Sequence, residues 1–223
     1  MKIIKFSETE KYNVPETWAE LPLCKFMELS FIKEDTDEVD KILKIAIALT
    51  GISEEKLLNL PYTEFTKIQS ACQFVFTEDN TKDIQYIIEI DNCKYGFDYD
   101  IAKMTTSEYF DIDHYVKNGN TIVNLNEIMA ILYREVNNVD KSKQEPFNYT
   151  IVNYESDKTA HRAKLFYEKM PASAAIAAQF FFLMVGISCM ESMKDYFQKE
   201  TSEKTKNPRK SRKAKASKND GVG

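Results

Sequence analysis

The sequence predicts a mainly helical α+β protein with a bundle-like helical body, a small β-hairpin and a disordered basic C-terminal tail. Apolar residues recur at helical spacing in several segments, and the spacing changes to strict alternation over residues 84–101. Charge also divides along the chain. Residues 1–198 carry 21 Lys and Arg against 32 Asp and Glu, whereas residues 199–223 carry 9 against 3. We therefore expect four parts: an N-terminal helical lobe (1–80), the β-hairpin (81–103), a C-terminal helical lobe (104–198) and the tail (199–223).

The composition supports a folded body. Of 223 residues, 43% are hydrophobic and 12% aromatic, and this apolar content is enough for an ordinary core. Only 6 Gly and 6 Pro are present, which is typical of a folded chain. The four cysteines are widely spaced and no secretory leader precedes them. We therefore expect reduced thiols in a cytosol-like compartment.

The N-terminal lobe begins with a strand at Ile3–Phe6 and continues with helices. Trp18 is expected to be a buried anchor at the start of the first helix. Asp35 and Glu38 have the spacing of a capping box, and Gly51 marks the end of the helix that they start. The apolar spacing predicts helices over residues 23–32, 35–51, 53–60 and 65–76.

The hairpin has one apolar and one acidic face. Isoleucine and tyrosine alternate with polar residues over 84–90, and the alternation resumes over 95–101 after a turn at 91–94. Because two strands alone are marginally stable, we expect the aromatic face of the hairpin to lie on helices, or the hairpin to pair with a third strand, which the segment near Met1 could supply. The turn resembles a calcium loop only in Asp91 and Gly96, since Cys93 and Tyr95 occupy positions that need oxygen donors.

The sequence also predicts helices in the C-terminal lobe. Thr105 and Glu108 form a second capping box, and a further helix runs from Asn124 through Tyr133. A polar loop is predicted over 137–145 and a short extended segment over 149–154. Ser156 with Asp157 is expected to cap the next helix.

Residues 170–190 contain no charged side chain, which makes this segment long enough to cross a bilayer. Gln179 lies near its centre, however, and much of it is alanine, so insertion into lipid gains little free energy. We expect a helix buried in the bundle. A membrane anchor over 171–190 is the alternative.

The sequence lacks a Gly-rich phosphate loop, a nucleophile elbow and paired metal-ligand motifs. Asp111, Asp113 and His114 form one local cluster, but their spacing points them to different faces of a helix, so we expect a solvated face. His161 and Arg162, with Lys158 and Lys164, are expected to form an exposed basic stripe. The sequence therefore predicts no enzyme and no catalytic, cofactor-binding or metal-binding residue.

The tail is the remaining candidate site, because it can neutralise phosphates of a polyanion. It has no aromatic ring to stack on bases, so nucleic-acid binding would be limited to the backbone. A solubilising terminus, or one that docks on an acidic protein surface, is the simpler reading. The candidate contacts are Lys204, Lys206, Arg209, Lys210, Arg212, Lys213, Lys215 and Lys218.

Two sets of segments carry a resemblance to a known family. They are Val14–Leu23 with Leu49–Glu55, and Met104–Tyr109 with Met129–Glu135, His161–Ala163 and Phe180–Leu183. This layout, over roughly residues 14–190, resembles small tail-assembly or virion-associated proteins of tailed bacteriophages, including crAss-like phages of Bacteroides-type hosts.

The resemblance implies a non-enzymatic, chaperone-like protein that binds a phage tail or virion polypeptide, in the host cytoplasm during assembly or in the virion. The basic tail belongs to no motif of that family. A virion-internal protein that contacts DNA without sequence preference through the tail is therefore the alternative, and the oligomeric state is not predicted.

Overall fold

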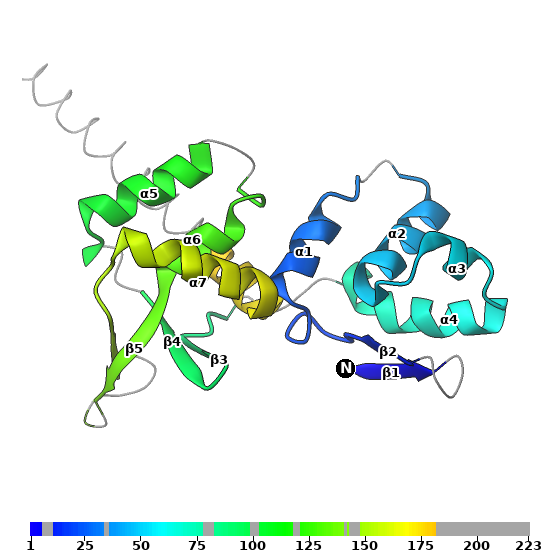
Figure 1. The fold of residues 1–223 in the computed structure, drawn as a ribbon, viewed down its shortest axis with the longest axis horizontal. Helices are drawn as coiled ribbons and strands as arrows, with labels where there is room; N and C mark the ends of the chain where they lie inside the picture. Colours follow the sequence, from blue (N-terminus) through cyan, green and yellow to red (C-terminus); the bar gives the residue numbers. More distant parts are fainter. Residues whose placement is uncertain are drawn as a thin grey trace, which may run out of the picture. The chain divides into compact units, whose positions relative to one another are not determined.

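The computed structural model describes residues 1–5, 11–33, 36–77, 83–98, 103–117, 121–140, 142 and 148–181 (Figure 1). Residues 1–179 form one compact unit. Helices and two antiparallel sheets make up this unit, which confirms the α+β class. The predicted basic tail lies outside the described residues.

The N-terminal part joins a two-stranded sheet to helices. The predicted first strand is confirmed as β1 (Lys2–Lys5), and it pairs antiparallel with β2 (Lys11–Val14), a strand that the sequence did not suggest. The helices are α1 (Leu23–Ser30), α2 (Glu38–Thr50), α3 (Glu54–Leu58) and α4 (Tyr62–Ala71), followed by the 3₁₀ helix η1 (Cys72–Phe76). Their buried faces share one hydrophobic cluster, against which Trp18 packs edge-on to Phe26 and Phe74.

Local signals fix the ends of these helices. Asp37 caps α2, because its side chain accepts a hydrogen bond from the Val39 amide at 3.0 Å. The predicted capping residue Asp35 lies outside the described residues. Gly51 ends α2 in the left-handed conformation with φ 70°. Ser53 caps α3 as predicted.

The second sheet has four antiparallel strands in the order β3 (Ile87–Ile90), β4 (Cys93–Phe97), β5 (Tyr133–Val139) and β6 (Tyr149–Ile151). The predicted hairpin is β3–β4, and its turn uses positive φ angles at Asp91 and Asn92. The expectation that a strand near Met1 completes this sheet is wrong. The third strand is β5, since Tyr95, Gly96 and Phe97 pair with residues 133–135.

The C-terminal part contains α5 (Thr106–Lys117), α6 (Leu125–Leu132) and α7 (Ser156–Lys169). The prediction of a helix through Tyr133 and a loop from residue 137 is wrong, because β5 begins at Tyr133 and continues to Val139. The extended segment after residue 149 is confirmed as β6. Ser156 is the first residue of α7 rather than its cap, which is Glu155.

The uncharged segment is described as far as residue 181 and is helical from residue 172. Its first turns are fully buried at Ala172, Ser173, Ala174, Ala175, Ala177 and Ala178, which confirms the buried-helix prediction over this part. Three backbone hydrogen bonds tie it to the chain around α1: Leu23 N to Met170 O, Ala172 N to Leu21 O, and Ser173 N to Trp18 O. Within the described residues, no helix combines the length and hydropathy that crossing a membrane requires.

Candidate functional site

An apolar groove lies on α2, α3 and α4, and we call it the α2–α4 groove. Its cavity volume is about 220 Å³. All of its lining residues are aliphatic or aromatic: Val39, Leu43, Leu57, Leu58, Leu60, Tyr62 and Phe65. The described surface therefore contains a groove without a charged lining side chain.

Three of these side chains are strongly exposed. Val39 is 70% exposed, Leu58 68% and Tyr62 77%. The five-residue helix α3 buries Leu57 in the core, and its neighbour Leu58 therefore faces away from the core. Clustered exposed apolar residues of this kind mark surfaces that bind other proteins.

The helices that form the groove carry acidic first turns. Glu38 and Asp40 lie in the first turn of α2, Glu54 and Glu55 in that of α3, and Glu64 in that of α4. Acidic side chains are favourable there because helix N-termini are electropositive. The same helices also carry Lys41, Lys44, Lys56 and Lys67, and Lys67 pairs with Glu64 at 2.8 Å, so charges of both signs lie on the helices that form the groove.

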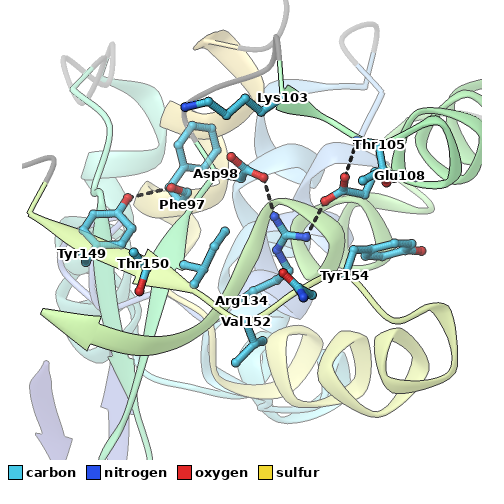
Figure 2. Close-up of a pocket in the computed structure, with 12 residues that line it drawn as sticks. Phe97, Asp98, Lys103, Thr105, Glu108, Arg134, Tyr149, Thr150, Val152 and Tyr154 are labelled. Atoms are coloured by element: carbon cyan, nitrogen blue, oxygen red, sulfur yellow. Dashed lines mark hydrogen bonds and ion pairs between the residues drawn. The ribbon is translucent and has the colours of Figure 1, made fainter.

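A second, polar cavity of about 630 Å³ lies between the β-sheet and the start of α5, and we call it the Arg134 pocket. Figure 2 shows Arg134 between Asp98 and Glu108. The lining residues come from the end of β4, the start of α5, β5 and β6: Phe97, Asp98, Lys103, Thr105, Glu108, Arg134, Tyr149, Thr150, Ile151, Val152, Asn153 and Tyr154.

Arg134 forms a buried ionic network. Its Nη1 donates to Glu108 and its Nη2 to Asp98. Arg134 is 5% exposed and Glu108 3%, whereas the Asp98 side chain is 21% exposed. Arg134 Nε is buried and has no hydrogen-bond partner among the described residues. One guanidinium thus pairs with two carboxylates, of which that of Glu108 is buried.

The capping box explains how Glu108 is held. Glu108 Oε2 accepts a hydrogen bond from the Thr105 amide at 2.5 Å, and Thr105 Oγ1 accepts one from the Glu108 amide at 3.3 Å. The predicted capping box is therefore confirmed, but the same carboxylate also binds Arg134, which the local pattern did not reveal. With one guanidinium paired to two carboxylates, this arrangement is suited to hold polar ligand groups by hydrogen bonding.

The structure separates the predicted polar clusters. Asp111 accepts a hydrogen bond from the Tyr154 hydroxyl at 2.5 Å, while Asp113 pairs with Lys117 at 2.8 Å. Within the described ranges, no group of three or more His, Cys, Asp or Glu side chains is placed to hold a metal ion.

The predicted exposed basic stripe on α7 is wrong at Arg162. This residue is 6% exposed, and its Nε donates to the Ala130 carbonyl oxygen at 2.7 Å. Burial, and then the charge of Arg134, lower the pKa of Arg162. Its position was visible in the sequence, since Thr159, Ala163 and Phe166 have the spacing of one buried helix face that includes residue 162.

The eight basic tail residues, Lys204 to Lys218, lie outside the described residues. The residues of both surfaces were only partly anticipated: Phe65 and the leucines of α3 as core positions, and Glu108 as a cap. No family model matches the chain, and no curated protein or solved structure matches it.

Proposed function

We propose that the protein is a non-enzymatic assembly protein of a tailed bacteriophage, which holds another tail or virion polypeptide in the α2–α4 groove. The observation that supports this proposal is the exposure of Val39, Leu58 and Tyr62 beside one another on an apolar groove. Covering a side chain of this size contributes roughly 1.5–3 kcal/mol, so a few such contacts hold a partner.

The occupant of the groove is an amphipathic helix of the partner. A groove between helices accepts apolar anchors spaced three or four residues apart. A chaperone-like protein with such a groove shields an apolar segment of its partner until assembly, in the host cytoplasm or in the particle.

The test is co-expression with the polypeptides encoded by the genes adjacent to its own, followed by affinity measurement. Leu58→Asp places a charge in the groove at a position that is 68% exposed, so the fold is retained. Phe110→Asp is the matched control, because Phe110 is 61% exposed on α5, outside the groove.

The wild type and Phe110→Asp should bind a neighbouring gene product, and Leu58→Asp should bind it at least tenfold more weakly, or about 1.4 kcal/mol. Equal binding by all three proteins, or binding to none of the neighbouring products, would contradict the proposal.

A second function rests on the tail, where eight Lys and Arg lie within residues 204–218. The protein would then contact DNA phosphates inside the virion without sequence preference. A gel-shift assay compares the full chain with a chain that ends at Gln198. Binding that disappears on truncation and weakens steeply with salt would support this function, and unchanged or absent binding would exclude it.

A further inference from the structure

Strand β6 is an edge of its sheet among the described strands, and its residues line the Arg134 pocket. The strand order is β3-β4-β5-β6, so within the described part of the chain β6 pairs only with β5. All six consecutive residues 149–154 line the pocket, and the other lining residues come from β4, β5 and the segment that leads into α5. The cavity therefore runs along β6 and the residues that follow it.

The hydrogen bonds show which backbone groups of residues 148–152 face β5. Val152 N donates to Glu135 O at 2.9 Å, and Asp140 N donates to Asn148 O at 2.6 Å. In an antiparallel ladder alternate residues face the same neighbour, so residues 148, 150 and 152 face β5. The backbone groups of Ile151 and Asn153 consequently point away from β5, and among the described residues none forms a hydrogen bond with them.

Packing fixes β6 in place without using this edge. A Cβ on Gly96 of β4 would lie 2.4 Å from the Tyr149 ring and 2.7 Å from Ile151, so both side chains pack directly on the β4 backbone. The Tyr149 hydroxyl donates to the Phe97 carbonyl oxygen at 2.6 Å. The free edge is thus preorganised, which lowers the entropy cost of binding.

The charges of the pocket limit what it can accept. Among the described lining residues, Asp98 and Glu108 are acidic and Lys103 and Arg134 are basic, so these four ionisable groups balance one another. A charged ligand group would disturb this balance near a buried ionic network. A volume of about 630 Å³ is within the range of ordinary ligand sites and leaves room for a short run of residues.

We propose that the Arg134 pocket binds an extended, uncharged peptide segment, which pairs as an added strand with the edge of β6 at Ile151 and Asn153. Main-chain hydrogen bonds supply the affinity in this mode of recognition, and the pocket selects the side chain that faces Arg134. This surface is independent of the α2–α4 groove.

Proline substitutions test the pairing directly. Ile151→Pro removes an amide that points away from the ladder, a position where edge strands tolerate proline. Asn153→Pro removes the second amide that points away from β5, and this variant tests the pairing if Ile151→Pro does not fold. Ile87→Pro is the matched control on the other edge: Phe97 N donates to Tyr86 O, so Ile87 is an outward position of β3, which lines neither cavity.

The probe is a yeast-displayed library of random decapeptides, selected on the full-length protein and counter-selected on Ile151→Pro. Recovered peptides should be uncharged where they contact the pocket and bind about tenfold more weakly to either outward proline variant of β6. Ile87→Pro and Leu58→Asp should bind them as the wild type does. In the bound state, backbone amide exchange should slow at residues 151 and 153.

Three results would overturn the proposal: no enrichment over the counter-selection, binding that both β6 proline variants retain, or a requirement for a charged residue at the contact. Loss of peptide binding in Leu58→Asp, with retention in the β6 variants, would place the peptide in the α2–α4 groove. That result would reject this inference without affecting the proposed function.

Discussion

Replacing Arg134 with Met should cause the largest loss of stability of any single substitution in the Arg134 pocket. The change leaves Glu108, which is 3% exposed, as a buried carboxylate without its cation. Removing one partner of a buried ion pair costs about 3–5 kcal/mol. Asp98 contributes less to this loss of stability, because its side chain is 21% exposed and water screens its charge. For a domain of this size the expected fall in Tm is roughly 2–4 °C per kcal/mol.

Urea unfolding followed by circular dichroism measures this loss of stability. Adding Glu108→Gln to Arg134→Met should restore part of the stability, because the amide needs no counter-charge. Lys117→Met is the control, since it removes a cation whose salt bridge with Asp113 lies on the exposed surface. A loss below about 1 kcal/mol for Arg134→Met would show that Arg134 contributes no more than an exposed ion pair does.

Other substitutions probe single contacts. Gly96→Ala should destabilise by about 1–3 kcal/mol in urea unfolding, because the new methyl group collides with the Tyr149 ring. Gly51→Ala should cost only about 1 kcal/mol in the same assay, since the surrounding space is open and only the φ of 70° is unfavourable. Burial raises the pKa of Cys72 to about 12, so iodoacetamide at pH 8 should label Cys93 well before Cys72, as mass spectrometry would show. Equal costs for the two alanines, or equal labelling rates, would contradict these expectations.

Features set by neighbouring residues were predictable from the sequence. The capping box of Thr105 and Glu108, the helix end at Gly51 and the β3–β4 hairpin each depend on a few adjacent residues, and the structure contains all three. The start of α2 is equally local, since Asp37 caps the helix within one turn of its first residues.

Strand β5 could not be predicted from the sequence because the strands that pair with it are distant in the chain. Tyr133 continues the apolar spacing of α6, so the pattern extends the helix by one residue too many. From the sequence alone Arg134 would be expected at the surface, because its partners Asp98 and Glu108 lie 36 and 26 positions earlier in the chain. The α2–α4 groove is equally non-local, because no single segment shows that Val39, Leu58 and Tyr62 gather on one surface.

The backbone hydrogen bonds that join residues 18–23 to residues 170–173 have a consequence for synthesis on the ribosome. The hydrophobic cluster of the N-terminal helices includes Ala172, so it stays incomplete until most of the chain has been translated. Contacts between such distant positions form slowly and leave apolar surface uncovered in the nascent chain. Ribosome-bound chains that stop before residue 170 should therefore be more sensitive to protease in the first helices than chains that extend past residue 180.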